Sequence, residues 1–301
     1  MRLGETIIDE TFAEAFGMKY ARVLVTAADE HWLDAALNAF TGFSTSIIGC
    51  DLEMGIETRL QPSETPDGRS GASVLAFGAS VDSIAKALPI RAGQCLMTCT
   101  STAAFDGLAA SEKRIDFGKH IRFFGDGFQK SKVIAGRRYW RIPVMDGEFL
   151  IEDTLGVEKG VAGGNIIIQG RDPDVTRLAA RQAVAAITEV AGVITPFPGG
   201  VARSGSKVGS RYESLRASTA EPFCPTLKGR VETKLYPDVN SVLEIVIDGS
   251  SDIAVRKAMR VAIKAAAQAG IVAISAGNYG GQLGPYHFHL HEILRDAEHP
   301  A

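Results

Sequence analysis

A carboxylate inside an aliphatic strand pattern is the residue of this sequence best suited to chemistry. Glu244 lies in the run Val242–Ile247, in which all the other residues are aliphatic. Because side chains alternate across a strand, Leu243, Ile245 and Ile247 share the face opposite Glu244 and are predicted to face the core. We expect another element or another subunit to cover the Glu244 face. Loss of water there would raise the pKa of the carboxyl and suit it to general-acid catalysis; the alternative is a solvated glutamate on an open sheet face.

The glycine-rich segment Pro196–Ser210 is a second candidate, because backbone N–H groups and one cation can bind a carboxylate or phosphate. Its candidate ligand-binding residues are Gly199, Gly200, Ser206 and Lys207. The segment has the glycine spacing of a nucleotide P-loop, but that motif needs the lysine before the hydroxyl residue and a helix afterwards. Here serine precedes lysine and no helical pattern follows. A nucleotide site is therefore excluded, and a ligand-binding loop or a plain connection remains.

Two further groups of glycine and asparagine lie at predicted strand ends. Gly163, Gly164 and Asn165 begin one strand, and Asn278 follows another after Gly277. Close approach to a ligand explains such residues, and so does a positive φ or tight backbone packing without any ligand. Both interpretations stay open from the sequence.

Three histidines, His287, His289 and His291, alternate near the C-terminus and would share one face of a strand. A His-x-His pair can bind zinc. No carboxylate or cysteine stands at ligand spacing beside them, so we predict a terminal edge strand, with a zinc site as the alternative.

The elements that must position these residues repeat along the chain. Residues 9–100 and 152–277 each follow the order strand, helix, strand, strand, helix, strand, which is the ferredoxin-like split unit. In the first copy the predicted strands are 22–27, 46–50, 74–77 and 94–98, with helices behind Asp29 and over 84–92. In the second copy the predicted strands are 165–169, 192–195, 242–247 and 271–275, with helices over 179–190 and 255–266.

The repeat predicts an α+β fold of two ferredoxin-like lobes that arose by internal duplication, residues 1–147 and 148–301. A hairpin over 139–151 joins them and turns at Asp146-Gly147. Matching Ser73-Val-Leu to Ser241-Val-Leu places Ala76 opposite Glu244. A carboxylate where the duplicated fold needs only alanine indicates a functional site.

Composition excludes several function classes. The chain has 301 residues, of which 46% are hydrophobic and 22% charged, and a net charge of −3. These values are typical of a globular protein and give no reason to expect a nucleic-acid partner. No apolar run is long enough to cross a membrane, and the N-terminus has too many acids for a signal peptide. The four cysteines form no Cys-x-x-Cys pair and predict a reduced, cytoplasmic protein.

An ordered set of short blocks resembles one family over essentially the whole chain, the formylmethanofuran:tetrahydromethanopterin formyltransferases. The blocks are Glu10–Phe16, Phe123–Phe128, Gly160–Asn165, Pro196–Gly200, Ser206–Ser210, Ala217–Thr219 and Ile274–Asn278. The resemblance implies formyl transfer between the amine of a methanofuran-type cofactor and N5 of tetrahydromethanopterin, in one-carbon metabolism. It also implies two ferredoxin-like lobes, and assembly as a homo-oligomer or with hydrolase partner subunits. The family's catalytic glutamate falls on Glu244.

We therefore predict an acyltransferase with Glu244 as the catalytic residue, no bound metal and no prosthetic group, the two formyl carriers being substrates. The N–H groups near Gly163–Asn165 or Gly199–Val201 are candidates to bind the oxyanion, and Lys207 could pair with an acidic ligand tail. The predicted substrate-binding residues are Gly163, Gly164, Asn165, Gly199, Gly200, Ser206, Lys207, Ser218, Thr219 and Asn278. The alternatives are a metal-dependent hydrolase that uses the C-terminal histidines and a non-catalytic scaffold subunit of a formyltransferase/hydrolase complex.

Overall fold

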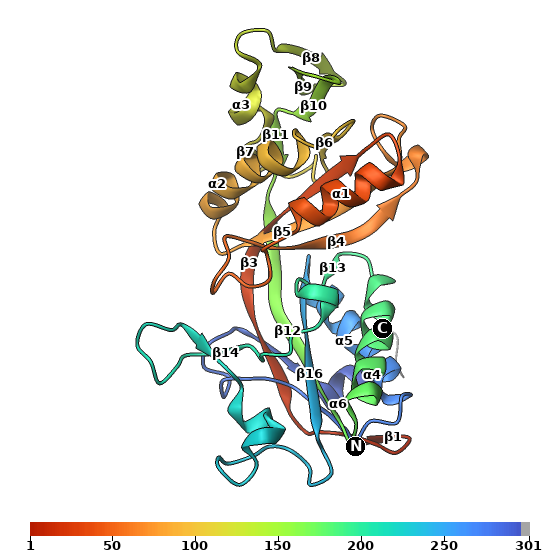
Figure 1. Ribbon diagram of the computed structural model, residues 1–301, viewed down its shortest axis with the longest axis vertical. Helices are drawn as coiled ribbons and strands as arrows, with labels where there is room; N and C mark the ends of the chain where they lie inside the picture. Colours follow the sequence, from red (N-terminus) through yellow and green to blue (C-terminus); the bar gives the residue numbers. More distant parts are fainter. Residues whose placement is uncertain (296–301) are drawn as a thin grey trace. The chain divides into compact units, whose positions relative to one another are not determined.

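The computed structural model describes residues 1–295, and the chain forms two compact units. One unit comprises residues 18–160; the other comprises residues 1–17 together with residues from 161 onward. The predicted lobes, residues 1–147 and 148–301, differ from these units, because they place residues 1–17 with the first lobe. Each unit combines strands with α-helices, so the fold is of the mixed α/β class (Figure 1).

The sheet of the 18–160 unit has the strand order β4-β5-β3-β6, and each neighbouring pair is antiparallel. The elements in chain order are β3 (Phe12–Thr26), α1 (Glu30–Phe40), β4 (Glu53–Leu60), β5 (Gly71–Gly78), α2 (Val81–Arg91) and β6 (Ala103–Asp106). Strand β3 begins within the other unit. Residues of both helices pack with the inward side chains of the strands in one apolar core.

The same unit continues through shorter elements after β6. These are β7 (Arg114–Asp116), α3 (Gly118–Ile121), β8 (Lys130–Ile134), β9 (Arg137–Val144), β10 (Gly147–Glu152) and β11 (Thr154–Gly156). Strands β9 and β10 form the predicted hairpin, with Gly147 paired to Val144 across the turn. The φ of Gly147 is +140°, a conformation that favours glycine. The predicted hairpin is confirmed, but its two-residue loop is Met145-Asp146, one residue before the predicted turn.

The second unit has the strand order β17-β12-β16-β13, again with every neighbouring pair antiparallel. Its main elements are β12 (Glu158–Gly170), α4 (Pro173–Thr188), β13 (Val193–Ile194), β16 (Ser241–Gly249), α5 (Asp252–Ala267) and β17 (Ala273–Ser275). Helices α4 and α5 share one core with the inward residues of β12 and β16. Alanines on both helices, among them Ala179, Ala183, Ala258 and Ala262, allow close packing.

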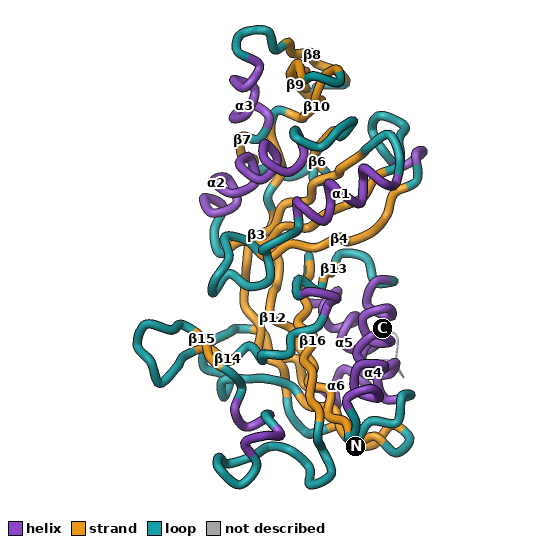
Figure 2. The backbone as a smooth tube through the Cα atoms, viewed as in Figure 1, coloured by secondary structure: helices purple, strands orange, loops and turns teal. Residues whose placement is uncertain are grey.

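The remaining elements of this unit are short. They are β1 (Arg2–Leu3), β2 (Thr6–Ile8), β14 (Lys207–Val208), β15 (Ala217–Ser218), β18 (Tyr286–His289) and α6 (Leu290–Arg295). Most of the segment between β13 and β16 is loop, as Figure 2 shows, interrupted by single helical turns. Loops of this length inside compact domains usually carry function.

The helix starts follow the predicted capping residues. The Asp29 carboxylate accepts a hydrogen bond from the Trp32 N–H at 3.1 Å, and the Asp172 carboxylate accepts one from the Asp174 N–H at 2.7 Å. Pro173 occupies the first turn of α4, where no N–H donor is required.

Two predicted strands in the first unit are wrong. Residues 46–50 form a turn, because the N–H of Cys50 donates to the carbonyl of Ser46 at 2.8 Å; the strand follows at β4. Residues 94–98 continue from α2 as a wider helical turn, in which the N–H of Met97 donates to the carbonyl of Ala92 at 2.9 Å. The closing strand is β6 instead.

The predicted equivalence of Ala76 and Glu244 is also wrong. Gly78 and Gly249 each end a strand, and each is followed two residues later by a serine that caps the next helix. Counting back five residues from each glycine places Ser73, not Ala76, at the position of Glu244. An offset of three residues reverses the face of a strand. Ala76 accordingly packs in the core of its unit.

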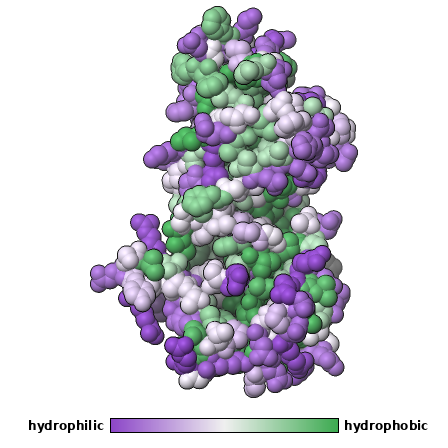
Figure 3. Space-filling model, viewed as in Figure 1, coloured by the Kyte–Doolittle hydropathy of each residue, from purple (hydrophilic) through white to green (hydrophobic). Residues whose placement is uncertain are grey.

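The surface on the face viewed in Figure 3 has hydrophilic side chains with smaller hydrophobic areas between them. Within residues 1–295, none of the helices combines the length and apolar character that a membrane span requires.

Candidate active site

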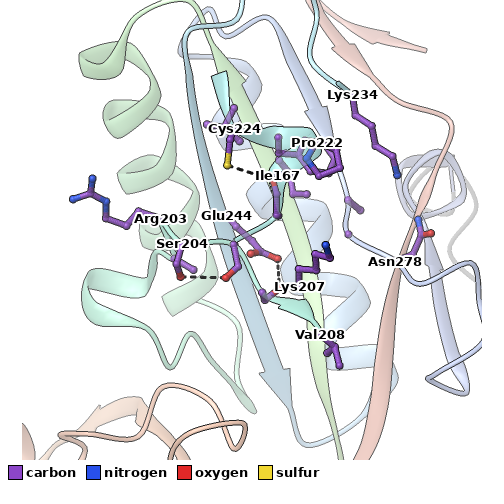
Figure 4. A pocket seen from close by; sticks show the side chains of 18 of the residues that line it. Ile167, Arg203, Ser204, Lys207, Val208, Pro222, Cys224, Lys234, Glu244 and Asn278 are labelled. Atoms are coloured by element: carbon purple, nitrogen blue, oxygen red, sulfur yellow. Dashed lines mark hydrogen bonds between the residues drawn. The ribbon is translucent and has the colours of Figure 1, made fainter. Parts of the chain in front are cut away.

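A cavity of about 260 Å³ lies within the second unit, over the face of the sheet opposite α4 and α5. Four segments line it: the β12–β16 pair, residues 202–208, residues 220–224 with Lys234, and residues 276–279 (Figure 4). The predicted residues Ser206, Lys207, Glu244 and Asn278 all line this cavity. The structure therefore brings together residues that are as much as 72 positions apart in the sequence (206 to 278).

Glu244 lies at the middle of this cavity wall and is only 5% exposed. It faces Ile167 across the β12–β16 ladder, and its backbone exchanges hydrogen bonds with Ala202 at 2.8 and 3.0 Å. On the opposite strand face, Ile245 and Ile247 are fully buried in the core, as predicted. The Glu244 face is covered, as predicted, and the chain's own 202–208 segment contributes to the cover.

The Glu244 carboxyl has one described side-chain partner, the Ser206 hydroxyl, which donates to Oε1 at 2.7 Å. Burial raises the pKa of Glu244 above its ordinary value, and hydrogen bonds from the hydroxyl and the N–H of Ser206 offset part of that rise. A carboxyl with a raised pKa retains a proton that it can donate to a leaving group. The solvated-glutamate alternative is therefore wrong.

Tyr279 joins the loop that carries Ser206 to the C-terminal side of the cavity. Its hydroxyl donates to the Ser206 carbonyl at 2.6 Å and accepts from the Val208 N–H at 3.3 Å. Burial raises the pKa of Tyr279, the hydrogen bond from the Val208 N–H offsets part of that rise, and the negative charge of Glu14 adds to it. A neutral hydroxyl of this kind acts as both donor and acceptor.

Lys207 lies at the edge of the cavity and has a partner already. Its ammonium donates to both carboxylate oxygens of Glu221, at 2.6 and 2.8 Å, and this lowers the pKa of Glu221. Ser218 pairs with Lys207 across the β14–β15 ladder, and Ser218 and Thr219 line a second cavity of about 300 Å³ that Lys207 also borders. These two predicted residues are thus adjacent to the main cavity but do not line it.

Asn165 and Asn278 use their side chains to fix the backbone of the cavity wall. The Asn165 amide donates to the Gly277 carbonyl at 3.1 Å and accepts from the Gly277 N–H at 2.6 Å. The Asn278 amide donates to Thr11 Oγ1 and to the Phe12 carbonyl, at 3.1 and 3.0 Å. Asn278 lines the cavity, whereas Asn165 supports it from behind.

The predicted glycines lie outside the cavity lining and have roles in packing. A Cβ on Gly164 would lie 2.4 Å from Val255, and one on Gly200 would lie 2.7 Å from Val184, so both positions require glycine for close approach. Gly163 has a φ of +93°, and its N–H donates to Asp248 at 3.0 Å. Gly199 has a φ of +63° within a single helical turn.

The lining residues that the sequence analysis did not single out include Cys224, Lys234 and Tyr279. The Cys224 thiol contacts the Thr219 hydroxyl at 3.2 Å. The Lys234 ammonium lies 5.9 Å from the centre of the Phe223 ring, and within residues 1–295 no carboxylate pairs with it. Cys224 and Lys234 fall in the long segment between β13 and β16, but no spacing singles them out from their neighbours.

The C-terminal histidines do not share one strand. His287 and His289 lie on β18, but the chain turns into α6 at Leu290, which places His291 on a helix. His287 Nε2 lies 3.1 Å from the Gly284 carbonyl, and His291 Nε2 lies 2.8 Å from the Ile8 carbonyl. Among the described residues, no three His, Cys, Asp or Glu side chains gather in a metal-binding group. The predicted three-histidine strand is therefore wrong.

Comparison with known proteins agrees with the predicted resemblance. Residues 1–144 match the family model described as formylmethanofuran-tetrahydromethanopterin formyltransferase, and residues 147–293 match the model of its proximal lobe. A formylmethanofuran–tetrahydromethanopterin formyltransferase of Methylobacillus flagellatus is 53% identical over 98% of this chain and 100% of its own length. One of Methylococcus capsulatus is 55% identical over 95% of this chain and 97% of its own.

A solved structure has the same fold. The crystal structure of the formyltransferase/hydrolase complex of Methylorubrum extorquens with methylofuran contains a chain that is 46% identical, with a TM-score of 0.94 and 98% of each chain covered. Both family models together span nearly the whole sequence, and the described cavity lies in the part that matches the proximal-lobe model. The chain therefore belongs to the formylmethanofuran-tetrahydromethanopterin formyltransferase family.

Proposed function

We propose that the chain transfers a formyl group between the amine of a methanofuran-type cofactor and N5 of tetrahydromethanopterin, with Glu244 as the proton-transfer residue. The observation that carries this assignment is a buried carboxyl with a raised pKa on the wall of a cavity, in a member of a formyltransferase family. Both carriers are substrates, and the reaction belongs to one-carbon metabolism.

The reaction requires proton transfer at two nitrogens, and a buried carboxyl can carry it out. N5 of the pterin attacks the formyl carbon and gives a tetrahedral oxyanion, and the bond from that carbon to the furfurylamine nitrogen then breaks. The departing amine gains one proton and N5 loses one. Glu244, protonated at the outset, can give its proton to the amine and recover one from N5, so it returns to its starting state. Such a carboxyl typically contributes about 10²–10⁴-fold in rate.

Ser206 and Lys234 have distinct proposed roles beside Glu244. The Ser206 hydroxyl binds Oε1 and leaves Oε2 of the carboxyl to face the substrates. Lys234 brings a positive charge to the cavity without a carboxylate partner among residues 1–295, so it can bind an anionic group of a ligand or the oxyanion. Lys207 remains a proposed ligand for an acidic tail, in exchange for its contact with Glu221.

Three of the N–H groups that the sequence suggested for binding the oxyanion already have acceptors within the fold. The N–H of Gly163 donates to Asp248, that of Gly200 to the Phe197 carbonyl and that of Val201 to the Pro198 carbonyl. Each of these donors is engaged within the fold. The N–H groups of Ser204 and Gly205, which line the cavity beside Glu244, are the better candidates.

The repeated strand order supports the proposal that the fold arose by duplication of a ferredoxin-like unit. In chain order, both four-stranded sheets read fourth, first, third, second strand, with one helix after the first strand and one after the third. The division into lobes at residues 147 and 148 accords with the boundary between the two matched family models.

Partners and location are proposed from the relatives. The Methylorubrum extorquens neighbour is part of a formyltransferase/hydrolase complex, which supports hydrolase subunits or a homo-oligomer as the assembled form of this chain. The cysteines of the described residues are free thiols, in accord with a cytoplasmic protein.

The direct test is formyl transfer with purified protein and both carriers, followed by the absorbance of the pterin. We expect turnover by the isolated chain, and activity that survives exhaustive chelation. A folded chain that transfers no formyl group alone, but does so once hydrolase subunits are added, would favour the scaffold alternative. Loss of activity on chelation with recovery on adding zinc would favour the metal-dependent alternative.

A further inference from the structure

Glu14 is a second buried carboxylate beside the cavity, and it has an unusual environment. It lies on β3 within the second unit and is 1% exposed. Oε1 accepts from the N–H groups of Leu283 and Gly284 at 2.5 and 2.6 Å, and Oε2 accepts from those of Tyr279 and Gly281 at 2.7 and 3.0 Å. Within the described part of the chain, no cation forms an ion pair with it.

Burial by itself raises the pKa of Glu14, but hydrogen bonds from the four backbone N–H groups lower it more, so the net shift is downward. Glu14 is therefore held as a carboxylate by backbone dipoles alone. Gly281 has a φ of +74°, which turns its N–H inward, and a Cβ on Gly284 would lie 2.2 Å from the Ala15 carbonyl oxygen. The sequence of the 279–284 segment is thus suited to wrap this one side chain.

The 279–284 segment, which Glu14 organises, begins with Tyr279. The Tyr279 hydroxyl holds residues 206–208 through its hydrogen bonds with the Ser206 carbonyl and the Val208 N–H. Three hydrogen bonds connect Glu14 to the candidate catalytic carboxyl: Glu14 to the Tyr279 N–H, the Tyr279 hydroxyl to the Ser206 carbonyl, and the Ser206 hydroxyl to Glu244. Through the last two contacts, the position of Tyr279 sets where the Ser206 hydroxyl lies. Asn278, at the head of the same segment, also lines the cavity.

We propose that Glu14 and Tyr279 are positioning residues for formyl transfer: Glu14 folds the 279–284 segment, and Tyr279 thereby holds Ser206 against Glu244. The inference rests on the proposed function of Glu244. It gives Glu14 a role at a distance from the reacting atoms, through hydrogen bonds that are all within one compact unit. Neither residue has to touch a substrate.

The Ser206 hydrogen bond favours the ionised form of Glu244, so weakening it raises the pKa of Glu244. If Glu244 acts as an acid, the pH at which kcat falls on the alkaline side then moves upward. Other titratable groups that line the cavity are Arg203, Lys207, Lys234, Cys224 and Tyr279 itself. Their identities do not change in a Ser206→Ala variant, which makes that variant the reference for this shift.

The test compares Tyr279→Phe, Ser206→Ala and the double variant by the pH dependence of kcat and KM. Tyr279→Phe removes the hydrogen bonds of the hydroxyl with the Ser206 carbonyl and the Val208 N–H, and we expect kcat to fall about tenfold. KM for both carriers should stay near the parent value, and the alkaline limb of the kcat–pH profile should move to higher pH. Because Tyr279 acts through Ser206, the double variant should match Ser206→Ala within about twofold. Tyr236→Phe, which loses a hydroxyl bound to Asp9 outside the cavity lining, is the matched control.

Two results would overturn the positioning role of Tyr279. In the first, the fold losses of kcat in the two single variants multiply in the double variant. In the second, KM rises while the alkaline limb of the kcat–pH profile stays in place. Each result indicates a direct contact of Tyr279 with substrate. Glu244→Gln measured alongside separates the two levels of the proposal. Full activity in Glu244→Gln removes the proposed function itself. An inactive Glu244→Gln with a Tyr279→Phe indistinguishable from Tyr236→Phe removes only the positioning role.

Glu14→Gln tests the first link. The glutamine amide turns one N–H₂ group toward two backbone donors, so we expect a lower melting temperature and a fall in kcat with the same upward shift of the alkaline limb. Glu57→Gln, at a buried carboxylate in the other unit, should lower the melting temperature without moving the limb. A folded Glu14→Gln with the kcat and limb of the parent contradicts the inference. If Glu14→Gln does not fold, the Tyr279→Phe series decides.

Discussion

Each unit of the molecule buries a glutamate on its sheet, and the two carboxylates differ in their partners. Glu57, on β4, is 8% exposed, and the Arg22 guanidinium donates to both of its oxygens at 2.7 and 2.8 Å. The Ser73 hydroxyl adds a third hydrogen bond at 2.6 Å. Glu244, on β16, is similarly buried and has a serine partner as well, but no cation pairs with it within residues 1–295.

The difference shows which buried carboxylate is suited to catalysis. A bidentate arginine neutralises a carboxylate and makes its protonation unfavourable, which suits an interaction that stabilises a fold. Glu244 has neither a cation nor the four N–H donors that keep Glu14 ionised, so the desolvation penalty outweighs its hydrogen bonds with Ser206 and the carboxyl retains a proton that it can transfer. Burial is common to both sites, and the arginine is what separates them.

The largest expected effect is on the rate of Glu244→Gln. Glutamine keeps the size and the acceptor of the side chain but cannot release a proton as a carboxyl does. We expect kcat to fall about 10²–10⁴-fold, which corresponds to roughly 3–5 kcal/mol of barrier, with KM for both carriers little changed. Steady-state kinetics of the purified variant, measured with its melting curve, provide the test.

A folded Glu244→Gln protein whose kcat stays within about threefold of the parent would show that Glu244 does not transfer the proton. Glu152 and Asp153, the acidic residues at the start of the second copy of the repeat, would then be the next carboxyls to consider. The structure makes them weaker candidates, because Arg137 binds both oxygens of Glu152, and the indole N–H of Trp140 donates to Asp153 at 2.5 Å.

The matching change in the first unit, Glu57→Gln, should affect stability and leave the rate alone. It removes the charge from a buried group that Arg22 and Ser73 both contact, and one donor of the arginine loses its acceptor. We expect the free energy of unfolding to fall by about 1–3 kcal/mol. Denaturant titration measures this loss, and kcat of the folded variant should equal that of the parent. A change in kcat without a change in stability would remove the contrast between the two glutamates.

Lys234→Met tests the cation that sequence reasoning missed. If its ammonium binds an anionic group of a ligand, KM for that carrier should rise about tenfold, since a hydrogen bond to a charged group contributes about 1.5–3 kcal/mol. Methionine keeps much of the apolar contact with Phe223. Lys257→Met, on the exposed surface of α5, is the matched control. If KM is unchanged for both carriers, Lys234 has no role in binding.

The order of elements could be predicted from the sequence because helices and buried strands have strong periodicity and caps. Asp29, Asp172 and Pro173 mark helix starts by local chemistry, and the aliphatic run around Glu244 marks β16. Strand β4 was missed because charged residues interrupt its apolar pattern, and residues 46–50 look like a strand although local hydrogen bonds close a turn there. Local sequence does not reveal which of two short apolar runs pairs with β5.

Of the site, the sequence could identify Glu244 and Ser206, because one breaks an aliphatic pattern and the other lies in a glycine-rich loop. It could not distinguish glycines that approach a ligand from Gly164 and Gly200, which approach Val255 and Val184. It also gave no reason to connect Glu14 with Tyr279, which are 265 positions apart. Such a connection depends on tertiary packing, and no local pattern records it.

The smallest expected effect is on the pH dependence of stability, and its sign separates Glu244 from Glu14. The pKa of Glu244 is raised in the folded protein, chiefly by burial, so the folded state binds more protons than the unfolded state between the unfolded and folded values. The stability that the neutral carboxyl contributes is complete below the unfolded pKa and is lost as pH rises through the folded pKa. Glu14 has a lowered pKa, so its contribution is present above the unfolded value and is lost as pH falls through the folded one.

Denaturant unfolding of the parent, Glu244→Gln and Glu14→Gln at several pH values measures both signs. Glutamine does not titrate, so each difference from the parent isolates one carboxyl. As pH rises from the acid side, Glu244→Gln should gain stability relative to the parent, whereas Glu14→Gln should lose it. The acid limit removes the charge of Glu14, and there the difference between Glu14→Gln and the parent should be smallest. Two curves with the same slope would mean that the two carboxyls do not differ in ionisation, and that Glu244 does not retain a proton in the folded protein.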